Sequence, residues 1–158
     1  MTTNRSRKQL IRSIADETGR SYIEIARLAD TFDKTLDEHP RLTSFGMGTY
    51  WRPDDTAEQR AEEFDKERAH LRSSLPIVIT VTLWLTANIG MIKTPTRGSY
   101  GLKHLAESSV GHYVTNGQLI AAALIAGYPM LENRGPNPLF GMRKRDLDRA
   151  DAAVNAKR

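Results

Sequence analysis

Cysteine is absent from this sequence of 158 residues, which excludes disulfide bonds, thiolate zinc sites and cysteine nucleophiles. Long apolar runs are also missing. The longest, residues 75–85, is interrupted by Thr80 and Thr82 and is too short to span a bilayer. The N-terminal residues are polar and basic and lack the apolar segment of a secretory signal peptide. These absences predict a protein of the reducing cytoplasm that makes no membrane contact.

The residues that are present have the composition of a soluble globular chain, with 39% hydrophobic and 27% charged residues. The length predicts one domain, or one domain with an extension. A net charge of +4 favours a polyanionic partner, although many soluble proteins are equally basic. The basic residues concentrate in residues 5–12 and 143–145, and residues 54–67 between them are acidic.

Apolar residues at helical spacing predict a mainly α-helical fold that begins with an N-terminal helical pair in residues 1–38. The first helix covers about residues 7–18. The second begins near Ser21, where Glu24 three positions later completes a capping box. An aromatic loop follows in residues 39–55, with two prolines and two glycines. A loop this long either packs on the core or makes contacts with a partner, and we expect packing.

Residues 56–142 are predicted to form the helical core domain. Asp55 or Thr56 caps a charged helix that reaches about residue 73. In residues 75–89 the strand pattern is an alternation of Ile77, Ile79, Val81, Leu83 and Leu85 with Thr80, Thr82 and Trp84. Pro76 near their start also permits a buried helix. A loop is expected at 131–138 and a short extended piece at 139–142. Residues 143–158 are predicted to be a basic C-terminal helix or tail.

The centre of the chain has the pattern of a helix-turn-helix-like hairpin over residues 99–127. Ser99 is expected to cap the first helix, and Gly111 to end it. Thr115 or Asn116 is expected to cap the second, which stops before Gly127.

Residues leading into and along this hairpin have the chemistry of nucleic-acid contacts, which use cations, hydroxyl groups and helix N-termini. Between residues 119 and 126 the second helix is apolar all round, so only its first turn is expected to reach bases. We expect the residues just before and within the first helix to contact phosphates, and the first turn of the second helix to contact base edges. The candidates for phosphates are Lys93, Thr96, Arg97, Ser99, Tyr100, Lys103 and His104, and those for base edges are Thr115, Asn116 and Gln118.

The sequence contains no residue pattern that is typical of a catalytic site. The four histidines are scattered without metal-ligand spacing, and Ser99 with His104 lacks a third orienting group. The sequence G-M-G at 46–48 lacks the strand and helix that surround a phosphate-binding loop. We therefore predict no catalytic residues, no metal site and no cofactor.

The pattern W-L-x-x-N-I, K-T, S-Y-G-L-K-H, Y-V-T-N-G and A-G-Y, spread over residues 84–128, resembles a family of uncharacterised small bacterial proteins encoded on plasmids, phages and other mobile elements. The resemblance covers roughly residues 84–140. It implies a helix around Trp84 and brings no established catalytic residue.

The sequence as a whole predicts a DNA-binding accessory or regulatory protein of a mobile genetic element, with double-stranded DNA as its partner. The alternative is a protein-interaction module that binds a host or element-encoded protein without touching nucleic acid. Its surface would be the aromatic loop around Phe45, Tyr50 and Trp51 together with the acidic residues 54–67. The oligomeric state stays open.

Overall fold

The computed structural model describes the backbone of residues 2–158 and the side chains of residues 4–158. Within them it confirms the mainly α-helical fold. The helices are α1 (Thr2–Thr18), α2 (Tyr22–Glu38), α3 (Ala57–Arg72), α4 (Leu75–Asn88), α5 (Ser99–Val110), α6 (Asn116–Ile125) and α7 (Lys144–Asn155). The short strands are β1 (Leu42–Thr43), β2 (Gly46–Met47), β3 (Arg97–Gly98), β4 (Met130–Leu131) and β5 (Leu139–Phe140). None of the described helices combines the length and apolar character needed to cross a membrane.

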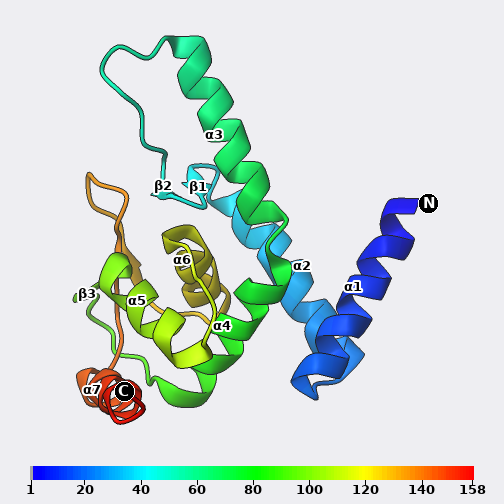
Figure 1. Ribbon diagram of the computed structural model, residues 1–158, viewed down its shortest axis with the longest axis vertical. Coiled ribbons are helices and arrows are strands. Elements are labelled where there is room, and N and C mark those ends of the chain that lie inside the picture. Colours follow the sequence, from blue (N-terminus) through cyan, green and yellow to red (C-terminus); the bar gives the residue numbers. More distant parts are fainter. Residues whose placement is uncertain (1) are drawn as a thin grey trace.

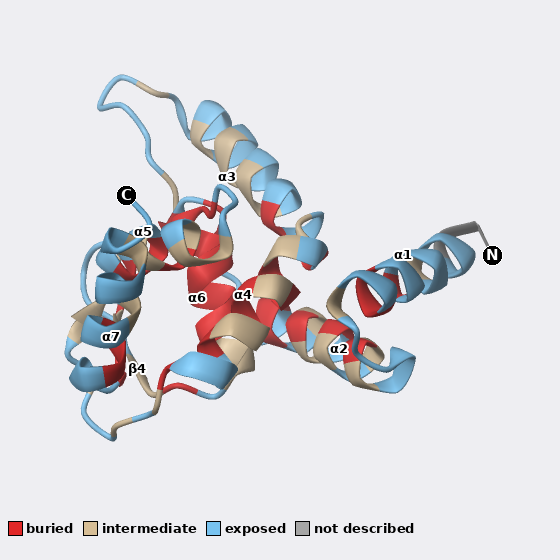
Figure 2. Cartoon of the chain, turned by 60° about the horizontal axis from the view of Figure 1, so that its bottom comes forward, coloured by how far each residue is buried: buried red, intermediate tan, exposed pale blue. Residues whose placement is uncertain are grey.

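The two most apolar helices, α4 and α6, pack against each other at the centre of the molecule, and α2 and α5 pack around them (Figure 1). Buried residues concentrate on these helices, while α1 and the N-terminal end of α3 are largely exposed (Figure 2). Every residue of α6 from Asn116 to Ala123 is buried. The expectation that α6 is mostly core is therefore confirmed.

Residues 75–88 form a helix, which resolves the choice between strand and helix. Pro76 lies in the first turn, where the missing N–H costs no helical hydrogen bond. The hydroxyl of Thr82 donates to the carbonyl of Val78 at 2.8 Å, so this buried polar side chain is satisfied inside the helix. Burial on several sides explains the nearly continuous apolar run, because a central helix needs no polar face.

The N-terminal pair is confirmed, and α1 packs along α2 through Ile11, Ile14 and Ala15 while leaning away from the rest of the molecule (Figure 1). Ser21 caps α2 by accepting a hydrogen bond from the Glu24 N–H at 3.2 Å. The carboxylate of Glu24 lies 3.4 Å from the Arg20 guanidinium. Only half of the expected capping box is therefore formed.

The loop predicted at 39–55 contains the β1–β2 hairpin, which approaches the first turn of α6 very closely. The Gly117 N–H donates to the carbonyl of Ser44 at 3.0 Å. A Cβ atom at Gly117 would overlap the carbonyl oxygen of Thr43. From α3, the Arg68 guanidinium donates to backbone carbonyls at the end of α2 and in β1, which fixes the hairpin from the other side.

The remaining strands form a three-stranded antiparallel sheet in the order β3-β5-β4, and β3 packs beside α5. The extended piece expected at 139–142 is confirmed, since β5 pairs with both neighbours and Met142 bridges to Met91. Residues 132–138 form the loop between β4 and β5. Helix α7 packs on α5, and its buried Asp146 accepts a hydrogen bond from the Gly90 N–H at 2.8 Å.

Candidate functional site

The three side chains expected to contact base edges are buried. The Thr115 hydroxyl accepts from the Gln118 N–H at 3.1 Å, and the Gln118 side chain accepts from the Thr115 N–H at 2.8 Å. This reciprocal capping box closes the N-terminus of α6. Thr115 is therefore confirmed as the cap. The capping box uses the polar groups of Thr115 and Gln118 that were expected to contact base edges, and Asn116 is buried beside them.

The first helix of the hairpin begins one residue earlier than expected. Its N-cap is Gly98, and the side chain of Ser99 is fully buried without a hydrogen-bond partner in the described protein. The Ser99 hydroxyl therefore neither caps α5 nor reaches a phosphate. Gly111 ends α5 as predicted, in the left-handed conformation with φ of 76°.

Lys103 is also buried rather than open to solvent, and only 7% of its surface is exposed. Its ammonium group lies 3.6 Å from the Glu107 carboxylate, and His104 lies 3.8 Å from the same carboxylate. The pKa of Glu107 is lowered, chiefly by the hydrogen bond from the Val114 N–H and secondarily by these cations. Glu107 thus offsets the charge of Lys103 and also borders His104, two residues that were expected to hold phosphates.

The other candidates of the lead-in segment do not form a cationic cluster. Lys93, Thr96 and Tyr100 are exposed and Arg97 is half-buried. Arg97 lines a groove that also contains Asp148 and Asp151 of α7, so acids border it. The phosphate-binding segment proposed from the sequence is therefore not assembled as a continuous basic surface.

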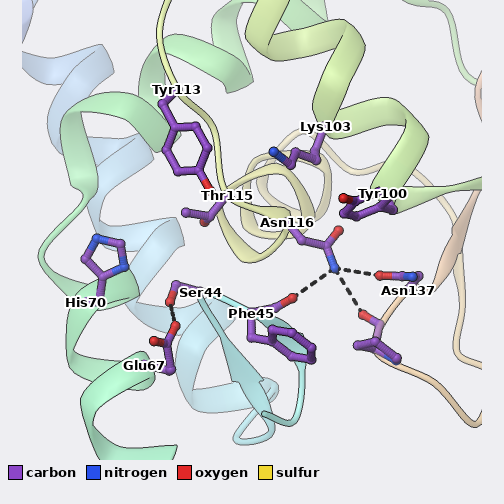
Figure 3. Close-up of a pocket in the computed structure, with 11 residues that line it drawn as sticks. Ser44, Phe45, Glu67, His70, Tyr100, Lys103, Tyr113, Thr115, Asn116 and Asn137 are labelled. Carbon is purple, nitrogen blue, oxygen red and sulfur yellow. Dashed lines mark hydrogen bonds between the residues drawn. The ribbon is translucent and has the colours of Figure 1, made fainter. Parts of the chain in front are cut away.

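A pocket of about 440 Å³ lies between the β1–β2 hairpin, α3, the α5–α6 turn and the β4–β5 loop (Figure 3). We call it the Asn116 pocket. Tyr100, Lys103 and Tyr113 line one side, and Phe45 and His70 line the other (Figure 3). Ser44 donates to the carboxylate of Glu67 in its wall. The pocket thus combines aromatic rings with polar groups of both signs.

Asn116 is the most constrained polar residue of this pocket. Three acceptor oxygens surround its Nδ2 atom and share its two hydrogens: the carbonyl of Phe45 at 3.1 Å, the carbonyl of Pro136 at 3.3 Å and Oδ1 of Asn137 at 2.8 Å. Three oxygen acceptors around one atom identify it as the amide nitrogen, which fixes the orientation of the side chain. The Oδ1 atom is buried and has no donor among the described residues. An acceptor without a donor is costly inside a protein and is a candidate contact for a ligand.

A second cavity of about 420 Å³, which we call the arginine groove, adjoins the Asn116 pocket and shares Phe45 and Pro136 with it. Three arginines from different segments line it: Arg41 before β1, Arg60 of α3 and Arg134 of the β4–β5 loop. No acidic residue belongs to the described lining. None of the three guanidinium groups forms a salt bridge within residues 4–158.

Trp51 forms an aromatic wall of the arginine groove. The Arg60 guanidinium lies over its ring, 3.9 Å from the centroid. The Nε atom of Arg60 is buried and has no acceptor among the described side chains and backbone. Trp51 is 48% exposed and Tyr50 is 63% exposed, so the expectation that this loop packs on the core is wrong for both rings. The arginine groove therefore presents cations and an aromatic face together.

Sequence inspection missed this groove. Arg41 and Arg60 are 19 positions apart, and Arg60 and Arg134 are 74 positions apart, so no local pattern links them. The one available signal was the aromatic loop, whose Trp51 we expected to be covered. No group of three or more histidine, aspartate or glutamate side chains in the described residues is placed to hold a metal ion. Comparisons with protein-family models, with curated proteins and with solved structures find no match to this chain.

Proposed function

We propose that the protein binds nucleic acid through the arginine groove and acts without catalysis, as an accessory or regulatory protein of a mobile genetic element. The observation that carries this proposal is the convergence of Arg41, Arg60 and Arg134 beside Trp51, with no acid in the described lining. The proposal keeps the function expected from the sequence but moves the contact surface away from residues 93–103.

The chemistry of the groove supports a phosphate-bearing strand. Guanidinium groups bind phosphate oxygens through two parallel hydrogen bonds, and arginine loses less hydration than lysine when it does so. Because no salt bridge occupies these three arginines, a phosphate displaces no acidic partner. Exposed rings such as Trp51 and Phe45 provide stacking faces for bases, and stacking does not depend on base identity. The combination favours binding with little sequence preference.

We further propose that α5 and α6 form a helix-turn-helix-like hairpin that serves as scaffold. In DNA-binding hairpins of this kind the second helix enters the major groove with its first turn. Here the β1–β2 hairpin covers the first turn of α6, and Asn116, Gly117 and Gln118 are buried. This burial argues against insertion of α6 into the major groove of a duplex. We therefore favour single-stranded over double-stranded nucleic acid, since stacking rings need bases whose faces are open.

A protein partner is the second candidate, and the exposure of Tyr50 supports it. Tyr50 borders a third cavity together with the acids Asp55, Glu62 and Glu63. An exposed aromatic ring beside acidic side chains suits a basic partner, because such rings are favoured at interface centres. In this alternative the arginine groove has no role.

Fluorescence anisotropy separates the two. A labelled single strand of about 12 nucleotides and the matching duplex are titrated with the protein at about 50 mM salt. We expect the single strand to bind more tightly than the duplex. The combined variant Arg41→Gln, Arg60→Gln and Arg134→Gln should lose at least about tenfold in affinity, because three phosphate contacts are removed.

The matched control removes the same amount of positive charge from exposed positions on α1 and α2, as Lys8→Gln, Arg12→Gln and Arg27→Gln. Circular dichroism checks that both variants are folded. Equal losses in the two variants would mean that binding depends on net charge alone, and absence of binding by the unaltered protein would contradict the proposal and leave the protein partner.

A further inference from the structure

The Asn116 pocket contains two polar groups that the described protein does not satisfy. Asn116 Oδ1 is a buried acceptor without a donor, and the three oxygens around Nδ2 hold the amide in this orientation. Lys103 has three N–H donors and one described acidic partner, the Glu107 carboxylate at 3.6 Å, so donors of the ammonium group remain for a ligand. A ligand that donates to Asn116 and accepts from Lys103 would satisfy both.

Aromatic rings stand at the opening of the same pocket. Tyr113 is 73% exposed and Tyr100 is 55% exposed. The ammonium of Lys103 lies 4.8 Å from the centroid of the Tyr113 ring, so the donor and the ring are close neighbours. Phe45 contributes a third ring from the hairpin side (Figure 3). A flat group entering between these rings would gain stacking as well as hydrogen bonds.

The position of the pocket indicates the source of such a group. Phe45 and Pro136 line both the Asn116 pocket and the arginine groove, so the two cavities adjoin at these residues. For a strand that is held by its phosphates in the arginine groove, the Asn116 pocket is the adjoining cavity. Each natural base carries an N–H donor next to a ring-nitrogen or carbonyl acceptor on its pairing edge.

We propose that the Asn116 pocket holds one unpaired nucleobase of the bound strand; this rests on the proposed binding of nucleic acid in the arginine groove. The N–H of the base edge donates to Asn116 Oδ1. The neighbouring acceptor of the base receives a hydrogen bond from Lys103 Nζ, and the ring stacks on Tyr113. The pocket therefore excludes a base that is held in a duplex, because the pairing edge is then occupied.

The test compares two single strands of about 12 residues, one with normal bases and one in which every residue is abasic, so that the phosphates are retained. Each strand is titrated against the unaltered protein and against Tyr113→Ala. Tyr113 is exposed, so its removal leaves the core intact. The control variant is Tyr22→Ala, which removes an exposed tyrosine of α2.

We expect the abasic strand to bind the unaltered protein more weakly. Tyr113→Ala should lose about 5- to 100-fold in affinity for the normal strand, the range of one stacked base, and should bind the abasic strand as the unaltered protein does. Tyr22→Ala should bind both strands normally.

Three other outcomes would overturn the base pocket, and the last of them would also overturn the proposed function. If Tyr113→Ala binds the normal strand as tightly as the unaltered protein, the base pocket is refuted while binding in the arginine groove stands. If normal and abasic strands bind equally, the same conclusion follows. If neither strand binds at all, both the pocket and the proposed function are refuted.

Discussion

Replacing Gly117 by alanine tests how closely the β1–β2 hairpin approaches α6, and both cavities depend on that contact. The added Cβ atom would overlap the Thr43 carbonyl oxygen and would lie 2.7 Å from Ser44 Cα. Both neighbours are backbone atoms, so no side-chain rotation relieves the overlap. Overpacking of this kind costs about 1–3 kcal/mol. Gly101→Ala in α5 is the matched control, because nothing lies within 4 Å of its added Cβ.

Alanine in an unobstructed helix is more stable than glycine by about 0.5–1 kcal/mol, so Gly101→Ala should stabilise the protein. Gly117→Ala should instead destabilise it, and the two variants should differ in free energy of unfolding by at least about 1.5 kcal/mol. Denaturant unfolding followed by circular dichroism measures this difference. Because the hairpin carries Phe45, Gly117→Ala should also weaken strand binding. Equal stability of the two variants would refute the close approach of hairpin and helix.

Two further predictions concern buried hydrogen bonds. Arg68→Met should destabilise the protein by about 3 kcal/mol in denaturant unfolding, because three backbone carbonyls lose charged donors; a loss below about 0.5 kcal/mol would mean that α3 does not hold the hairpin. Tyr128→Phe should lose about 1–2 kcal/mol at neutral pH, since the hydroxyl donates to carbonyls at the end of α4. Burial, then the charge of Asp146, raises the Tyr128 pKa from 10.0 to about 12, so its contribution is complete below pH 10.0 and is lost as pH rises through about 12. The stability gap between the unaltered protein and Tyr128→Phe should therefore narrow across this interval, and a constant gap would contradict the assignment.

Local chemistry was enough to place most helix boundaries. Thr56 and Thr115 cap α3 and α6 because each is followed by a glutamine at the third helical position, and these short-range bonds need no tertiary information. The same bonds bear on the second role expected of Thr115. The sequence assigns the Thr115 hydroxyl both to the cap and to a base edge, but the residue that closes this capping box is buried, which limits its access to a partner.

The candidate site was less predictable because it depends on contacts between distant segments. Asn116 is oriented by carbonyls of residues 45 and 136, which no local pattern connects. Lys103 looked like a surface cation, yet it is buried at 7% exposure beside Glu107. Trp51 looked like a core residue and is half exposed. The charge or hydrophobicity of a residue alone does not decide whether its side chain is buried or exposed.

The salt dependence of single-strand binding tests the central claim most directly. Each phosphate neutralised by the protein contributes about −0.7 to the slope of log affinity against log salt for a single strand. If Arg41, Arg60 and Arg134 each hold a phosphate, their combined replacement by glutamine should make the slope shallower by about 2, while the control variant of α1 and α2 keeps the full slope. An unchanged slope in the groove variant would contradict the account, as would an equal change in the control.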